Sequence, residues 1–408
     1  MPVADILAHS PPFPLVLVIE YNDTGGNREL TAEDEDGIIL ALEQRDRVRR
    51  VRLQMSVPNL QKIIMAIDEE YPVLEYLIIH RLKEDDSTAF TPPGTFQAPH
   101  LRHLALKLFH LPTQSRLLTL ATGLVTLAFV ARHSSTHFQP NVMLQWLSLM
   151  PQLETLLIVF LLPVSSRDVE RQLMHTPHVT LPNLRWILFR GVKPYLEALV
   201  RRITAPRLEK FIIHFFEQLT FSVPRLLEFM NTTENLRFDS AKIWFSRDGV
   251  HMRLYPREKA QMYALSIDIC CCHLDGQVSS MAQVFDSLSQ LFSPVEHLSI
   301  EHRVHSRSTE EHNEVDRTEW HKLLRSLSNV KTFCIVNGLV EELSRCLRLE
   351  DGELPMELLP ELQELTYSGS GDVSDAFKPF IEARQKASRP VTLTLVDEEP
   401  SVPSTSSD

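Results

Sequence analysis

Apolar residues recur along the chain in a short phrase, Pro-x-Leu-x-x-Leu-x-Leu, in which other aliphatic or aromatic residues can replace leucine. Copies begin at Pro72, Pro99, Pro151, Pro182, Pro206 and Pro360. The last positions of each copy alternate, as in Leu104-Ala105-Leu106, which places the apolar side chains on one face of a short strand. A phrase that returns every few tens of residues indicates stacked supersecondary units.

Between these strands the apolar period lengthens from two to about 3.6, the period of an amphipathic helix. Such helical faces are predicted at 60–67, 196–203, 284–291 and 323–327. Pro72, Pro151 and Pro294 follow helical segments and stop them before the next strand. Each unit is therefore predicted to be a helix, a proline break and a strand.

The first apolar position of each unit defines its anchor. The anchors are Val48, Leu74, Leu101, Leu124, Leu153, Leu184, Leu208, Thr233, Met262, Val295, Val330 and Leu362. Their spacing is irregular and lies mostly within or just above the range of about 20–29 residues that leucine-rich repeats show. We predict an α/β fold, an irregular leucine-rich-repeat solenoid of about 12 units with a parallel sheet on one face and helices on the other.

This solenoid is predicted to cover residues 1–396, with residues 1–47 as an N-terminal cap. Asp248-Gly249 lies between alternating apolar residues and predicts a β-hairpin inserted at 243–255. The polar stretch 302–317 is predicted to be a charged surface loop. Residues 397–408 are rich in serine, proline and acidic residues and are predicted to be a disordered tail.

Composition narrows the class of protein further. The net charge of -12 argues against nucleic acid as a partner. No apolar run approaches the roughly 20 residues that span a bilayer, and no secretory signal is predicted at the N-terminus. The five cysteines are an odd number in a large chain, which favours a reducing compartment, the cytoplasm and/or the nucleus. We also expect a monomer without membrane association.

Catalytic motifs and metal-ligand spacings are missing from the sequence. Adjacent Cys270, Cys271 and Cys272, followed by His273, are the most plausible metal ligands, but they cannot all converge on one ion and have no second pair. The charged loop contains further potential ligands without His-Glu-x-x-His spacing. These are His302, His305, Glu310, Glu311, His312, Glu314 and Asp316. No phosphate-binding glycine loop or Gly-x-Ser-x-Gly motif is present. We predict a non-catalytic protein with no cofactor and no metal.

Several phrases resemble the irregular leucine-rich repeats of F-box proteins, in particular the large fungal family found in mushrooms. They include His-Ser-Pro-Pro-Phe-Pro-Leu at 9–15, Gln-Arg-Asp-Arg-Val-Arg-Arg at 44–50, Ala-Pro-His-Leu-Arg-His-Leu at 98–104, Met-Pro-Gln-Leu-Glu-Thr-Leu at 150–156 and Leu-Pro-Asn-Leu-Arg-Trp at 181–186. The resemblance covers about residues 5 to 396. It implies the substrate-receptor subunit of a cullin–RING (SCF) ubiquitin ligase, in which an F-box binds the Skp1 adaptor and the repeats bind the protein to be modified.

The sequence departs from the family pattern at its N-terminus. The segment Pro-Val-Ala-Asp-Ile-Leu at 2–7 is only faintly similar to the start of an F-box, and Pro11, Pro12 and Pro14 end any helix there. We therefore expect the chain to begin just after the place where an F-box would end. A Skp1-type adaptor is expected as a partner only if an F-box lies upstream of Met1.

The strand face opposite the leucines is predicted to be a concave protein-binding surface, because aromatic and arginine anchors dominate protein recognition. The predicted site residues are Arg50, Arg52, Tyr76, His80, His103, Lys107, Trp186, Arg190, Lys210 and His214. Later units are predicted to present an acidic face, with Asp268, Glu301 and Glu364. The alternative to a ligase receptor is a stand-alone leucine-rich-repeat scaffold with no role in ubiquitin transfer. A third alternative, an enzyme or metalloprotein using Cys270 to His273, predicts stoichiometric zinc.

Overall fold

A computed structural model describes most of the 408-residue chain. The described residues are 3–9, 11–20, 30–81, 93–109, 111–112, 114–131, 139–162, 177–216, 223–233, 235–256, 262–303, 317–336, 338–348, 357–368 and 375–395. They form two compact units, Met1–Glu209 and Lys210–Asp408. The predicted tail at 397–408 and most of the predicted charged loop, residues 304–316, lie outside the described residues.

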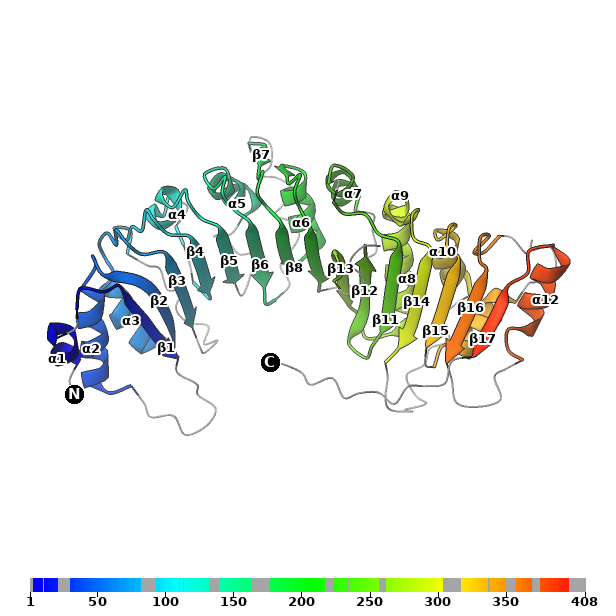
Figure 1. Ribbon diagram of the computed structural model, residues 1–408, viewed down its shortest axis with the longest axis horizontal. Coiled ribbons are helices and arrows are strands. Elements are labelled where there is room, and N and C mark those ends of the chain that lie inside the picture. The colour runs from blue at the N-terminus through cyan, green and yellow to red at the C-terminus, as the bar shows by residue number, and fades with distance from the viewer. Residues whose placement is uncertain are drawn as a thin grey trace. The chain divides into compact units, whose positions relative to one another are not determined.

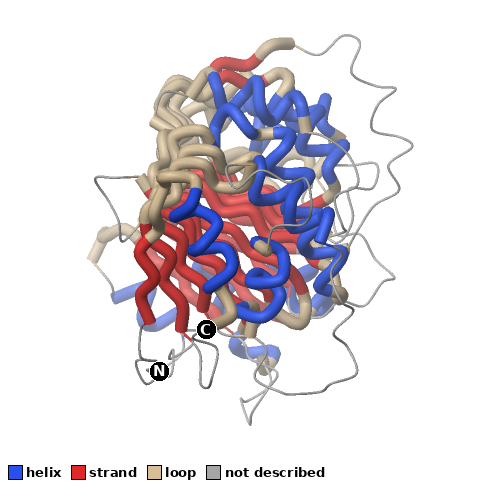
Figure 2. The backbone as a smooth tube through the Cα atoms, turned by 90° about the vertical axis from the view of Figure 1, so that its right-hand side faces the viewer, coloured by secondary structure: helices blue, strands red, loops and turns tan. Residues whose placement is uncertain are grey.

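The described residues form an α/β fold of 12 helices and a large, mostly parallel sheet of 15 strands, together with a separate pair of two-residue strands. Seven of the 15 strands belong to the first unit and eight to the second. Figure 2 shows most helices along one side of the strands. This arrangement is compatible with a solenoid-like α/β fold.

The first unit has its sheet strands in chain order, each parallel to the next. They are β1 (Leu15–Glu20), β2 (Val48–Met55), β3 (Tyr76–Arg81), β4 (His103–Lys107), β5 (Thr126–Ala131), β6 (Thr155–Phe160) and β8 (Trp186–Gly191). Figure 1 shows them from β1 in blue to β8 in green. The small parallel pair β7 (Val179–Thr180) and β9 (Ile203–Thr204) was not predicted from the sequence.

Helices connect these parallel strands, as a parallel sheet requires. The helices after β1 are α2 (Ala32–Leu42), α3 (Val57–Met65), α4 (Arg116–Leu120), α5 (Pro140–Leu147) and α6 (Lys193–Val200), and α1 (Val3–His9) precedes the first strand. Three of them, α3, α5 and α6, carry proline in the first two positions, where its missing N–H costs nothing. The anchor leucines are buried beneath them: Leu101, Leu124 and Leu153 are fully inaccessible to solvent.

The second unit contains parallel strands that flank an antiparallel hairpin. Its strands are β10 (Lys210–Phe215), β11 (Ser240–Phe245), β12 (Gly249–Tyr255), β13 (Leu265–Cys270), β14 (His297–His302), β15 (Thr332–Val336), β16 (Glu364–Ser368) and β17 (Thr392–Leu395). Their order in the sheet is β10-β13-β12-β11-β14-β15-β16-β17. The helices are α7 (Pro224–Asn231), α8 (Leu274–Ser287), α9 (Ser289–Phe292), α10 (Arg317–Arg325), α11 (Val340–Leu347) and α12 (Lys378–Lys386).

The hairpin changes the predicted topology. Strands β11 and β12 pair antiparallel, with Asp248 and Gly249 at their turn, and β12 also pairs antiparallel with β13. Strand β13 then pairs with β10, and β11 pairs with β14, so the chain crosses two strand positions between β10 and β11. Figure 1 shows the reversed order β13, β12, β11. The hairpin expected as an insertion into a parallel sheet instead contributes its two strands to the sheet, which is therefore mostly parallel, because a tight turn reverses the chain direction.

Several expected boundaries also change. Met262 is 62% exposed and is therefore not the buried first position of a unit. The strand expected directly after Thr233 begins only at Ser240, because the chain first crosses two strand positions. The helix predicted over 284–291 is interrupted at Leu288, where α8 ends and α9 begins. Ile203, predicted on a helical face, lies in β9. Strand β17 adds a parallel strand after the last predicted unit.

Candidate protein-binding face

The strands of the first unit expose alternate side chains on the sheet face opposite the buried leucines, which we call the open face. Burial alternates strictly along β3, β5, β6 and β8, with partly exposed residues at the first, third and fifth positions. Because the strands pair in register, these positions form three rows across the sheet. The rows bring together residues that are up to 136 positions apart, as Arg50 and Trp186 are in the first row.

The first row is basic and aromatic. In register it runs Arg50, Tyr76, His103, Thr126, Thr155 and Trp186. The Arg50 guanidinium lies 5.8 Å from the centroid of the Tyr76 ring, and that ring lies 5.5 Å from the ring of His103. A hydrogen bond of 3.1 Å joins His103 Nδ1 to Thr126 Oγ1. These contacts hold the side chains of neighbouring strands in place before any partner binds, which lowers the entropy lost on binding.

The middle row is apolar after Arg52. It runs Arg52, Ile78, Ala105, Ala128, Leu157 and Leu188, and each of these side chains is partly exposed. Arg52 forms an ion pair of 2.8 Å with Glu20 on β1. We call Ile78, Ala105, Ala128, Leu157 and Leu188 the apolar strip. This strip was not among the predicted site residues, although the middle strand position is apolar in consecutive strands and could have indicated it.

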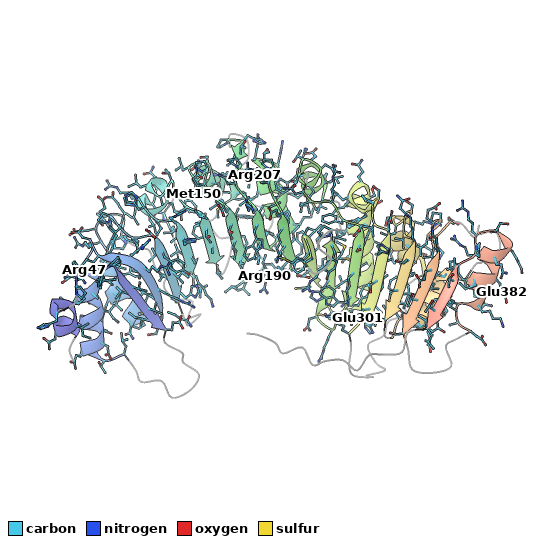
Figure 3. The ribbon with its side chains drawn as sticks, in the orientation of Figure 1. Arg47, Met150, Arg190, Arg207, Glu301 and Glu382 are labelled. Carbon is cyan, nitrogen blue, oxygen red and sulfur yellow. The ribbon has the colours of Figure 1, made fainter. Side chains whose placement is uncertain are left out.

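The third row runs Gln54, His80, Lys107, Val130, Val159 and Arg190. Burial, reinforced by the Lys107 charge, lowers the pKa of His80, and burial, reinforced by Arg102, lowers the pKa of His103. The lowered pKa values favour the neutral form of both imidazoles, which then act as polar, uncharged contacts. Figure 3 shows Arg190 at the carboxyl end of β8, whereas Arg207 projects at the opposite end of the strands.

The structure places every predicted site residue on the open face of a strand. Those from Arg50 to Arg190 belong to the first unit and lie in the three rows just described. Lys210 and His214 lie on β10, the first strand of the second unit. The predicted patch is thus divided between the two units, and each part is described with its own unit.

His214 belongs to a hydrogen-bonded triad in the second unit. The Asp268 carboxylate on β13 accepts hydrogen bonds of 2.8 Å from the Nδ1 atoms of His214 on β10 and His251 on β12. Burial acts to raise the pKa of Asp268, but the two histidine bonds outweigh it and hold the pKa at about 2. The carboxylate is only 15% exposed, so the triad is a fixed, charged part of this face.

We expect the Asp268 triad to make folding sensitive to acid. Because the folded pKa of about 2 lies below the unfolded value of about 3.9, the carboxylate stabilises the fold above the unfolded pKa and loses this effect as pH falls through the folded pKa. Wild type should exceed Asp268→Asn in free energy of unfolding by about 2 kcal/mol at pH 5, and this difference should vanish towards pH 2. Urea titrations between these pH values measure it, with the exposed Asp375→Asn as a control. A pH-independent difference would contradict the assignment.

The face of the second unit is not acidic as expected from the sequence. Glu301 on β14 is paired with Lys242 Nζ at 3.1 Å and with Arg303 Nε at 2.9 Å. Burial acts to raise the pKa of Glu301, but these two bonds outweigh it and the pKa is lowered. The hairpin strands supply Lys242, Trp244, His251 and Arg253 to this face. Asp268, Glu301 and Glu364 lie at the expected strand positions, but the face is mixed in charge because the hairpin, expected as an insertion, contributes its strands and their cations to the sheet.

The cysteine run lies at and beyond the end of β13. Cys270 and Cys272 are exposed, and burial raises the pKa of Cys271, whose Sγ donates to the His273 carbonyl over 3.7 Å. A raised pKa lowers the thiolate fraction that metal binding or nucleophilic attack requires. Within the described residues, no group of three or more histidine, cysteine or acidic side chains is arranged to hold a metal ion. The predicted ligands from His305 to Asp316 lie outside the described residues.

Comparisons with known proteins do not assign the chain to a family. No model of a known protein family matches it, and no curated protein does so. Of the helices in the described part of the chain, none is long and apolar enough to cross a membrane.

Proposed function

We propose that this protein is a non-catalytic protein-binding module, and specifically the substrate-recognition part of an F-box-type SCF ubiquitin ligase receptor. The observation that carries the proposal is the open face of the first unit. There, the basic and aromatic first row lies directly beside the apolar strip. Contacts between neighbouring strands already hold the side chains of this row in place. The resemblance of the repeat phrases to fungal F-box proteins supports the choice of ligase receptor.

The physical composition of this face favours protein recognition. Protein interfaces have an apolar centre with tyrosine, tryptophan and arginine as the main anchors. The apolar strip supplies such a centre, Tyr76 and Trp186 stand in the row beside it, and Arg190 stands on its other side. A partner that extends across several strands would cover the strip and reach these anchors together.

Replacing both Trp186 and Arg190 by alanine should weaken partner binding by at least about 30-fold, because an interface anchor contributes roughly 2 kcal/mol or more. The measurement is quantitative affinity capture from a fungal lysate with the tagged full chain, followed by titration of the captured protein. The exposed Arg201→Ala, which follows α6, serves as the matched control and should bind as wild type does. Unchanged capture by a folded double variant would rule out this face as the binding site.

The alternative proposal is a stand-alone leucine-rich-repeat scaffold with no role in ubiquitin transfer. The two proposals differ in whether a Skp1-type adaptor takes part. An in-frame F-box upstream of Met1, together with Skp1 in the captured complex, supports the ligase receptor. Capture of a partner without Skp1, from a gene that encodes no F-box, supports the scaffold.

The proposed place of action is the cytoplasm and/or the nucleus. All five cysteines lie in described residues and carry free thiols, which a reducing compartment would preserve. Fluorescence microscopy of the tagged protein tests this localisation.

A further inference from the structure

Arg253 on β12 has an unusual environment on the face of the second unit. Its guanidinium carbon lies 4.8 Å from the Trp244 ring centroid and 4.6 Å from the Tyr263 ring centroid. Among the described residues no carboxylate contacts it, and its buried Nε atom has no hydrogen-bond partner. A guanidinium donates hydrogen bonds only in its plane, so aromatic contacts position the group without using its donors.

The charges around Arg253 are not balanced. Lys242 lies directly opposite Arg253 in the β11–β12 register, and like charges at such positions destabilise a strand pair. The guanidinium carbon of a third cation, Arg303, lies 4.9 Å from the centroid of the Trp244 ring, which Arg253 also contacts. Glu301 is paired with Lys242 and Arg303, and Asp268 is paired with two histidines. The two carboxylates that the structure describes on this part of the face, Glu301 and Asp268, are therefore already engaged, and no described carboxylate pairs with Arg253.

Lys210 extends this positive region on its other side. Its Nζ atom lies 4.5 Å from the centroid of the same Tyr263 ring that Arg253 contacts. Lys210 and Arg253 thus contact the same aromatic ring, that of Tyr263. The Trp244 side chain is only 7% exposed and gives Arg253 a second, rigidly held aromatic contact. We refer to Lys210, Lys242, Trp244, Arg253 and Tyr263 as the Arg253 site.

We propose that the Arg253 site binds the oxyanion of an acidic side chain, a carboxylate or a phosphate, in an extended segment of the partner protein. This inference rests on the proposed function and adds the chemistry of the segment that is recognised. Arginine forms paired hydrogen bonds with the planar oxygens of a carboxylate or phosphate, and such charge-assisted bonds are about twice as strong as neutral ones. The ligand would supply an anion for Arg253, which no described carboxylate provides, and reduce the repulsion from Lys242.

A protein segment fits this site better than nucleic acid. The chain carries a net charge of -12, which opposes a continuous phosphate backbone over its whole length. A side-chain oxyanion needs only one local group of cations. Aromatic residues with arginine also occur in sites for single-stranded nucleic acid, so an oligonucleotide is included in the test.

The test measures fluorescence anisotropy of labelled octapeptides with the full chain. One peptide is rich in glutamate, one carries phosphoserine at the same positions, and one carries glutamine. We expect both acidic peptides or one of them to bind and the glutamine peptide not to bind. Arg253→Met should weaken binding at least about tenfold, because it removes the donors and keeps the apolar stem. Arg253→Lys, which keeps the charge without the planar fork, should give an intermediate loss.

The control is Arg237→Met, an exposed arginine of the same unit that precedes β11. It changes the net charge equally and should leave affinity unchanged. Equal binding by wild type and Arg253→Met, or no binding of either acidic peptide to wild type, would overturn the inference. A single-stranded oligothymidine that binds more tightly than both peptides would overturn it as well.

The outcome can be separated from that of the proposed function. The proposed function is tested through Trp186 and Arg190 in the first unit, and this inference is tested through Arg253 in the second. If the former variant loses its partner while acidic peptides do not bind, protein recognition stands and the acidic specificity falls. If acidic peptides bind through Arg253 while partner capture is unaffected by the first-unit variant, the Arg253 site stands alone.

Discussion

Replacing Gly249 by alanine should lower the free energy of unfolding by about 3 kcal/mol, because a Cβ atom has no space there. It would lie 2.4 Å from the Ile269 carbonyl oxygen and 3.3 Å from Cys270 Cα. Both are backbone atoms of β13, so no side-chain rotation relieves the clash. Strands β12 and β13 would have to separate, and these strands carry Arg253 and Asp268.

Urea unfolding measures this loss, and hydrogen exchange followed by mass spectrometry locates it. We expect faster exchange in β12 and β13 and little change in the first unit. Gly123→Ala is the matched control, because an added Cβ there meets nothing within 4 Å. A midpoint equal to that of wild type for Gly249→Ala would contradict the close approach of these strands.

Replacing Arg384 by methionine should also cost about 3 kcal/mol of stability. The Arg384 side chain in α12 is fully buried, and its Nη2 atom donates to the carbonyls of Pro360 at 3.1 Å and Leu362 at 3.0 Å. Methionine fills similar volume but leaves the part-buried Pro360 carbonyl and the buried Leu362 carbonyl without this donor. Each unsatisfied buried acceptor costs roughly 1–3 kcal/mol.

Thermal and urea unfolding of Arg384→Met measure the effect. Arg389→Met is the control, because that side chain is 59% exposed and its one ion-pair partner among the described residues, Glu361, is 4.0 Å away. Surface ion pairs of this kind contribute about 0–1 kcal/mol, so the control should be nearly as stable as wild type. Equal losses in the two variants would show that the Arg384 hydrogen bonds do not join α12 to the segment before β16.

Local sequence predicted the start of several individual strands well. Strands β3, β4 and β16 each begin two residues after their anchor leucines, Leu74, Leu101 and Leu362. The reason is that each phrase contains its own determinants, an alternating apolar pattern and a proline that stops the preceding helix. Such features depend on neighbours only a few residues away.

The strand order of the second unit could not be predicted in this way. The pair Asp248-Gly249 indicated a hairpin, but not that its strands would join the sheet in reversed order. Which strands become neighbours in the sheet depends on the packing of segments far apart in the chain. The misplaced anchor Thr233 has the same origin, because it lies in the segment that connects β10 to β11 across two strand positions.

The same distinction between local pattern and long-range pairing applies to the predicted site residues. Alternation correctly indicated that Tyr76, Trp186 and His214 lie on the face opposite the leucines. It did not indicate the Arg253 site, because Lys210, Arg253 and Tyr263 meet only through pairing of β10, β12 and β13. Sequence alternation states which face a side chain occupies, but not its neighbours on that face.

The sequence by itself determined that this protein alternates helices and strands, with a leucine core on one face of the strands and partly exposed side chains on the other. These properties follow from short-range periodicity, since burial of every second strand residue is favourable in any unit. Only the tertiary structure decided which strands are neighbours, and so which charges meet. Arg253 contacts the rings of Trp244 and Tyr263, and no described carboxylate pairs with it, because sheet pairing sets strands of the second unit side by side in an order that differs from their order in the chain.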